Sequence, residues 1–199
     1  MNWKEAVAGI PSMYRANYLR AIADCVGTKV RGLVEIGCGY GDMSAILATA
    51  FPDAVLHLID PWSNDRGHIV SSPGGYFYKE HESLDQVYVS VCARMADIDK
   101  GSGRIVIHRE WSPDAAFAWK FLDTVDLVFI DANHSFAGCK NDIIAWKQVL
   151  DNSRAGRVGP GLLCGHDYGT RGVDQAIDFC FHGNVHLGHD GSWVHVLER

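Results

Sequence analysis

Short apolar runs alternate with longer amphipathic stretches along most of this 199-residue chain. A short apolar run is typical of a buried strand, whereas apolar positions that recur every three or four residues predict a helix. The runs predict strands at Leu33–Ile36, Val55–Asp60, Arg104–His108, Asp126–Asp131 and Gly161–Gly165. The stretches between them predict helices at Asp42–Ala50, Ser83–Ile98, Pro113–Phe121 and Gly138–Leu150. Such alternation is typical of an α/β fold with a parallel sheet that is covered on both faces.

The alternation stops near the end of the chain. A predicted helix at Gly172–Phe181 is followed by two strand-like pieces, Val185–Leu187 and Ser192–Leu197, which are joined by the turn sequence GHDG. We therefore predict a doubly wound, Rossmann-like, mostly parallel sheet with a C-terminal antiparallel hairpin. We expect a single domain over residues 1–199, with an N-terminal helical segment at 1–30 and a candidate lid loop at 62–82.

Three glycines follow the first predicted strand in the sequence LVEIGCGYGDMSAILA: Gly37, Gly39 and Gly41. A strand that ends in Gly-x-Gly-x-Gly and opens a helix lets a ligand approach the backbone closely. A phosphate loop would carry a Lys followed by Ser or Thr, and a dinucleotide site would place its third glycine where Asp42 stands. S-adenosylmethionine instead carries a sulfonium and an ammonium group, which Glu35 and Asp42 would attract.

Asp60 supports a nucleoside-type cofactor. It closes the second predicted strand, where an acid can accept hydrogen bonds from both ribose hydroxyls.

Two sequences, VEIGCGYG and LIDPW, resemble the first two motifs of the class I S-adenosylmethionine-dependent methyltransferases, and the resemblance extends from about Gly32 to the end. It implies that Asp60 holds the ribose and that Trp62 lies beside the adenine, either stacked on it or as a packing or lid aromatic. The sequence HREWSPDAA resembles the segment that borders the adenine, with Trp111 and Ser112 at the contacting positions. The implied cofactor residues are Glu35, Gly37, Gly39, Gly41, Asp60, Trp62, Trp111, Ser112 and Asp131.

Polar residues end the fourth and fifth predicted strands, in the sequences FIDANHSF and LLCGHDY. In such a sheet these two strands are neighbours about 4.8 Å apart, and their carboxyl ends border the ligand crevice. We therefore expect Asp131, His166 and Asp167 to converge beside the cofactor's methyl group. The residues also have structural alternatives: Asp131 as a helix cap, His134 as a loop residue, and His166–Asp167 as a hydrogen-bonded pair.

The sequences IDANHSFAGCKNDIIAWKQVL and GLLCGHDY resemble the small-molecule O-methyltransferases related to macrocin O-methyltransferase and, more distantly, the catechol O-methyltransferase group. The resemblance implies a divalent ion, Mg²⁺ or Mn²⁺, bound by Asp131, His166 and Asp167, with His134 as the general base. His166 departs from the acidic residue usual at its position. Mg²⁺ prefers oxygen ligands, so an imidazole at this position makes manganese, iron or zinc alternative metals. A further alternative is a site without a metal, in which His166 orients a water or the substrate.

Charge and composition narrow the class of protein further. The net charge is −6 and no Lys/Arg cluster stands out, so we expect no nucleic-acid partner. No apolar run reaches membrane-spanning length, and the six cysteines lack a Cys-x-x-Cys pair, so we expect a cytoplasmic protein that does not bind a membrane. The predicted activity is methyl transfer from S-adenosylmethionine to a hydroxyl of a small-molecule acceptor with help from a divalent metal. A metal-independent methyltransferase and a non-catalytic S-adenosylmethionine-binding protein are the alternatives, and a homodimer is compatible with the sequence.

Overall fold

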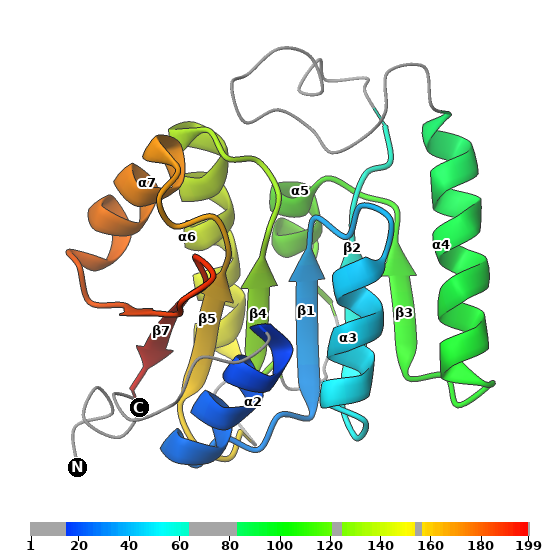
Figure 1. Cartoon of the computed structure of the whole chain (residues 1–199), viewed down its shortest axis with the longest axis horizontal. Coiled ribbons are helices and arrows are strands. Elements are labelled where there is room, and N and C mark those ends of the chain that lie inside the picture. Colours follow the sequence, from blue (N-terminus) through cyan, green and yellow to red (C-terminus); the bar gives the residue numbers. More distant parts are fainter. Residues whose placement is uncertain (1–14, 64–82, 121–124, 154–156, 199) are drawn as a thin grey trace.

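The computed structural model describes residues 15–63, 83–120, 125–153 and 157–198 of the chain. Its centre is a seven-stranded sheet in the order β3-β2-β1-β4-β5-β7-β6. The first five strands of this order are parallel, and β7 runs antiparallel to both β5 and β6 (Figure 1). The predicted mostly parallel sheet and its C-terminal hairpin are therefore confirmed. The strands are β1 (Gly32–Ile36), β2 (Val55–Ile59), β3 (Ile105–His108), β4 (Leu127–Ile130), β5 (Gly161–Gly165), β6 (His186–Leu187) and β7 (Trp193–Leu197).

Helices cover both faces of the sheet, as the apolar runs predicted. Alternate residues of β1 show why: Leu33 packs into one buried cluster with the helices α2, α3 and α4, and Val34 packs into a second cluster with α5, α6 and α7. Figure 1 shows α2 and α3 in front of the sheet and α5 and α6 behind it. The helices are α2 (Arg15–Val26), α3 (Asp42–Ala50), α4 (Leu84–Asp99), α5 (Ser112–Phe117), α6 (Phe136–Asn152) and α7 (Arg171–Phe181).

Among the helix boundaries that differ from the predicted ones, two have a local explanation. Helix α6 begins at Phe136, before the predicted Gly138, because the Ser135 hydroxyl accepts a hydrogen bond from the Gly138 N–H and caps the helix. The helix predicted at Pro113–Phe121 is wrong at its end, since α5 stops at Phe117 and residues 118–120 are not helical. The chain there turns the Trp119 ring edge-on against the buried Trp146 ring, with 5.1 Å between the ring centroids.

The N-terminal segment contributes one described helix, α2, within the predicted range 1–30. Its buried face includes Ala16, Leu19 and Ile22, which pack against the front of the sheet. The candidate lid loop at 62–82 lies outside the described residues except for its first two positions. None of the described helices combines the length and apolar character needed to cross a membrane.

A buried polar network joins α5 to α6 on the back of the sheet. The Ser112 hydroxyl donates to Asp142 Oδ1 at 2.6 Å and accepts from the Trp146 Nε1–H at 2.8 Å. Burial raises the pKa of Asp142 to about 7, although the hydrogen bond from Ser112 lowers it.

This network makes the stability of the fold depend on pH. Below its raised pKa the folded protein holds a proton on Asp142 that the unfolded chain has lost, so the free energy of unfolding falls as the pH rises toward 7. Between pH 5 and pH 8 the free energy of unfolding should fall in both proteins. We expect this fall to be smaller in the Asp142→Asn variant than in the parent, by on the order of 2 kcal/mol, because the variant lacks the titrating carboxyl. Urea unfolding at several pH values measures this difference. Parallel curves for the two proteins would show that Asp142 does not titrate in this range.

Candidate active site

The glycine loop between β1 and α3 lies directly against the end of β4. Gly37, Gly39 and Gly41 all have positive φ angles, of 85°, 54° and 78°, which favour glycine. A Cβ atom added at Gly37 would lie 2.0 Å from the carbonyl oxygen of Asp131. The absence of a side chain at this position therefore brings the predicted cofactor loop and the first residue of the predicted metal site together.

Asp60 lies at the end of β2 and is 7% exposed. Its Oδ2 accepts a hydrogen bond from the Gly39 N–H at 3.0 Å, and its Oδ1 accepts one from the Trp62 N–H at 2.8 Å. A carboxylate oxygen has two lone pairs, so these bonds leave capacity for further donors such as a ribose diol. The geometry suits the role that the sequence predicts for Asp60.

Glu35 is a fully buried acid beneath the glycine loop. Its Oε2 accepts a hydrogen bond from the Ser44 hydroxyl, and its Oε1 is buried without a hydrogen-bond partner among the described residues. Burial raises the pKa of Glu35 to about 8 against the opposing Ser44 hydrogen bond, and the charges of Asp131 and Asp60 add to the rise. A positively charged ligand would relieve the repulsion among these three acids, so the residues fit S-adenosylmethionine better than a phosphate-bearing cofactor.

The residues predicted beside the adenine are placed less favourably for direct contact. The Trp62 side chain is 1% exposed, and its Nε1–H donates to the Gly39 carbonyl at 2.9 Å. Its ring packs against Tyr88, which matches the packing alternative. The Ser112 hydroxyl is engaged in the network with Asp142, and Trp111 is the residue before α5. The adenine role of these residues stays a prediction.

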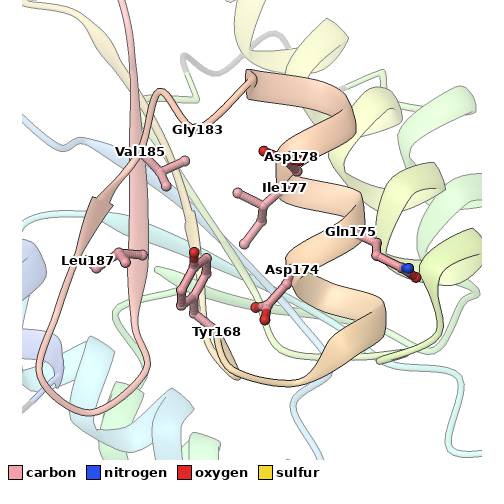
Figure 2. A pocket seen from close by; sticks show the side chains of 8 residues that line it. All are labelled: Tyr168, Asp174, Gln175, Ile177, Asp178, Gly183, Val185 and Leu187. Carbon is pink, nitrogen blue, oxygen red and sulfur yellow. The ribbon is translucent and has the colours of Figure 1, made fainter.

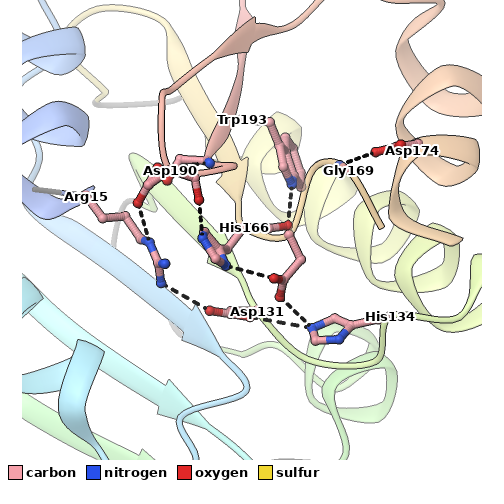
Figure 3. Close-up of polar contacts among 10 residues, drawn as sticks. Arg15, Asp131, His134, His166, Gly169, Asp174, Asp190 and Trp193 are labelled. Atoms are coloured by element: carbon pink, nitrogen blue, oxygen red, sulfur yellow. Dashed lines mark hydrogen bonds and ion pairs between the residues drawn. The ribbon is translucent and has the colours of Figure 1, made fainter. Parts of the chain in front are cut away.

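The acids and imidazoles that end β4 and β5 do come together (Figure 3). One ligand atom from each of Asp131, His166 and Asp167 lies within 4.8 Å of the others. His134 joins them, with its Nε2 at 2.9 Å from Asp167 and 3.6 Å from Asp131. The convergence expected from the strand order is thus present, while the chemical role of each residue stays a prediction.

The orientation of the His166 ring suits a metal ligand. Its Nε2 lies 2.7 Å from the backbone carbonyl of Asp190, and because a carbonyl only accepts hydrogen bonds, Nε2 must carry a hydrogen. Its Nδ1 lies 3.1 Å from Asp167 Oδ1, so this nitrogen donates to the carboxylate when the ring is protonated and presents a lone pair to a metal only when the ring is neutral. Metal-bound histidines commonly donate their second ring N–H in this way. The donor set of two carboxylates and one imidazole fits a divalent cation, and its nitrogen favours manganese, iron or zinc over magnesium.

His134 is held as a cation in this arrangement. The contacts with Asp131 and Asp167 raise the pKa of His134 to about 10, although burial opposes the rise. In turn the contacts with His134 and His166 lower the pKa of Asp167. An imidazolium cannot accept a proton, so a cation that neutralised these carboxylates would make His134 a better base.

Sequence reasoning missed two residues of this cluster, Arg15 and Asp190. Arg15 of α2 places its Nη1 3.4 Å from Asp131 Oδ2 and its Nε 3.1 Å from Asp190 Oδ2. Asp190 lies in the GHDG turn, which the sequence identified only as a hairpin turn. The pairing of β7 with β5, in which Trp193 faces Gly165, brings this turn beside the end of β5.

A cavity of about 380 Å³ lies between α7 and the hairpin (Figure 2). Aromatic and aliphatic side chains line it together with acids: Tyr168, Ile177, Val185, Leu187, Asp174 and Asp178. Tyr168 directly follows Asp167, so the cavity adjoins the acidic cluster along the chain. None of the predicted site residues lines it.

The fold and the glycine loop define a methyltransferase-type α/β protein. A family model described as a methyltransferase domain matches residues 34–168, and the chain belongs to this family. The family implies S-adenosylmethionine as the methyl donor. No curated protein matches the chain by sequence.

Solved structures share the fold at low sequence identity. A proposed O-methyltransferase from Klebsiella pneumoniae is 15% identical with a TM-score of 0.57, and the match covers 96% of this chain and 83% of that one. A proposed caffeoyl-CoA O-methyltransferase from Staphylococcus aureus is 14% identical with a TM-score of 0.55, covering 99% and 89%. A precorrin-6y C5,15-methyltransferase from Geobacter metallireducens GS-15 is 12% identical with a TM-score of 0.54, covering 96% and 95%. These likenesses show the fold alone, and the resemblance to the macrocin group stays a prediction.

The tight packing at Gly37 can be tested by comparing alanine substitutions at Gly37 and Gly39. In Gly37→Ala the new Cβ meets the Asp131 carbonyl, and the backbone is also left-handed, so we expect a loss of about 2–5 kcal/mol in the free energy of unfolding. Gly39 has the same backbone hand, but its Cβ position is open, so Gly39→Ala should lose only about 1–2 kcal/mol. Denaturant unfolding without ligands measures both. Equal losses would mean that the approach of the loop to β4 is not tight.

Proposed function

We propose that this methyltransferase transfers the methyl group of S-adenosylmethionine to a hydroxyl of a small molecule, with a divalent metal held by Asp131, His166 and Asp167. The observation that carries the proposal is that the backbone of Asp131, one residue of this cluster, lies directly against Gly37 of the glycine loop. A methyl donor on the loop and an acceptor oxygen at the cluster would then be neighbours.

The cofactor supplies a methyl group on a positively charged sulfur, which is already strongly electrophilic. The protein therefore has to align the acceptor and remove its proton. Asp60 would accept hydrogen bonds from the ribose, and Asp131 would provide negative charge near the cationic part of the cofactor. Burial raises the pKa of Glu35 to about 8, and a bound cation would favour the ionised form of this carboxyl.

A divalent ion at the cluster would lower the pKa of an acceptor hydroxyl and fix its direction. Asp131 and Asp167 would each offer a carboxylate oxygen to this ion, and His166 would offer Nδ1 while Asp190 holds its Nε2–H. Two carboxylates occupied in this way would no longer hold the proton on His134. His134 would then be able to accept the proton of the acceptor hydroxyl.

Metal-independent transfer is the alternative, and the contacts of Arg15 and His134 favour it. Arg15 contacts Asp131 and His134 contacts Asp167, so both carboxylates already have a cationic partner without a metal. In that case His134 and His166 would handle protons unaided, and a chelator would leave the activity unchanged.

The role of Asp60 tests the donor half of the proposal. We expect Asp60→Ala to weaken S-adenosylmethionine binding at least about tenfold, because the variant loses the acceptor for the ribose hydroxyls. Isothermal titration calorimetry measures the affinity, with Asp24→Ala as a control, since Asp24 is an exposed acid of α2 that pairs with Arg20. Unchanged binding in Asp60→Ala would contradict the assigned ribose contact.

His134 tests the chemical half of the proposal. We expect His134→Ala to lower the turnover of a hydroxyl acceptor by about 10²–10⁴, the usual contribution of a general base, with S-adenosylmethionine affinity nearly unchanged. Product S-adenosylhomocysteine is measured across a panel of small hydroxyl compounds, with and without a chelator and with Mn²⁺ added back. A variant that lost cofactor binding would place His134 in the cofactor site instead. A parent enzyme that formed no product with any acceptor would support a non-catalytic binding protein.

A further inference from the structure

The guanidinium of Arg15 contacts the carboxylate of Asp131, which is a predicted metal ligand. It reaches across from α2 to the end of β4, where its Nη1 is 3.4 Å from Asp131 Oδ2, and its Nε is 3.1 Å from Asp190 Oδ2 (Figure 3). The Arg15 side chain is 25% exposed and that of Asp131 is 24% exposed, so their contact is less screened by solvent than a typical surface ion pair.

The helix that carries Arg15 is firmly anchored. The next residue, Ala16, is fully buried, and Tyr18 bonds through its hydroxyl to the His186 ring of the hairpin. The guanidinium therefore starts from a fixed backbone position above the crevice. Its contact with Asp131 is a consequence of how α2 packs on the sheet and the hairpin.

A guanidinium and a divalent ion would compete for the same carboxylate. Both bind through positive charge, and two cations that share Asp131 would also repel each other at short range. The contact to Asp190 gives Arg15 a second carboxylate to hold when Asp131 is taken. That acid is bonded through its backbone carbonyl to His166, so the three residues form one connected unit.

We infer that Arg15 is a built-in competitor that weakens divalent-metal binding at Asp131, His166 and Asp167, so that a metal binds only when Arg15 shifts toward Asp190. The inference rests on the proposed metal site and adds the residue that sets its affinity. It is a positioning role, because Arg15 acts through Asp131 rather than on the reacting atoms.

The experiment measures Mn²⁺ alone with the whole protein, by electron paramagnetic resonance of the free ion and by calorimetry near neutral pH. We expect Arg15→Met to bind Mn²⁺ at least about tenfold more tightly than the parent, because the competing charge is gone while the aliphatic stem remains. Arg15→Gln should behave in the same way, and Arg15→Lys, which keeps the charge, should stay closer to the parent. Arg20→Met is the matched control, since Arg20 lies on the same helix and pairs with Asp24 instead.

The outcomes separate this inference from the proposal on which it rests. Mn²⁺ binding of equal or lower affinity in both Arg15→Met and Arg15→Gln would overturn the competition while leaving the metal site in place. Tighter binding in Arg20→Met as well would overturn it too, because the effect would then reflect net charge alone. No Mn²⁺ binding by the parent or by any variant at millimolar concentration would remove the metal site and the inference together.

Discussion

The site depends on the close approach of β1 and β4 at their carboxyl ends. Gly37 leaves room there for the Asp131 carbonyl, which would lie 2.0 Å from any Cβ at that position. This contact joins two loops that would otherwise belong to separate crossovers. It gives one crevice both the bare backbone that suits a nucleoside and the acids that suit a cation.

The crevice gathers four acidic side chains, Glu35, Asp60, Asp131 and Asp167. Each acid is stabilised differently: Glu35 by a raised pKa, Asp60 by two backbone N–H groups, and Asp131 and Asp167 by the cations Arg15 and His134. Asp167 also adopts a left-handed backbone with a φ of 60°, an uncommon conformation for a residue with a side chain. Strained backbone and perturbed pKa values of this kind cluster at functional sites.

The sequence predicted the parts of this arrangement that follow from local rules. Strand ends are marked by where an apolar run stops, so the convergence of Asp131, His166 and Asp167 follows once β4 and β5 are neighbours. The end of α5 could not be predicted from such rules. Trp119 packs against the ring of Trp146, which is distant in the sequence, and helical periodicity does not reveal that contact. Trp62 likewise has a side-chain direction that only the packed core determines.

The presence of Arg15 and Asp190 in the cluster could not be predicted from local rules for a different reason. They come from opposite ends of the chain and meet only because β7 pairs with β5 while α2 packs on the same side. Tyr18 and His186 repeat this connection one helical turn along α2. The N-terminal helix and the C-terminal hairpin therefore brace each other above the crevice. A shift of either segment would alter the charge facing Asp131 and the carbonyl that orients His166, so the properties of the cluster depend on elements that themselves contribute none of the predicted metal ligands.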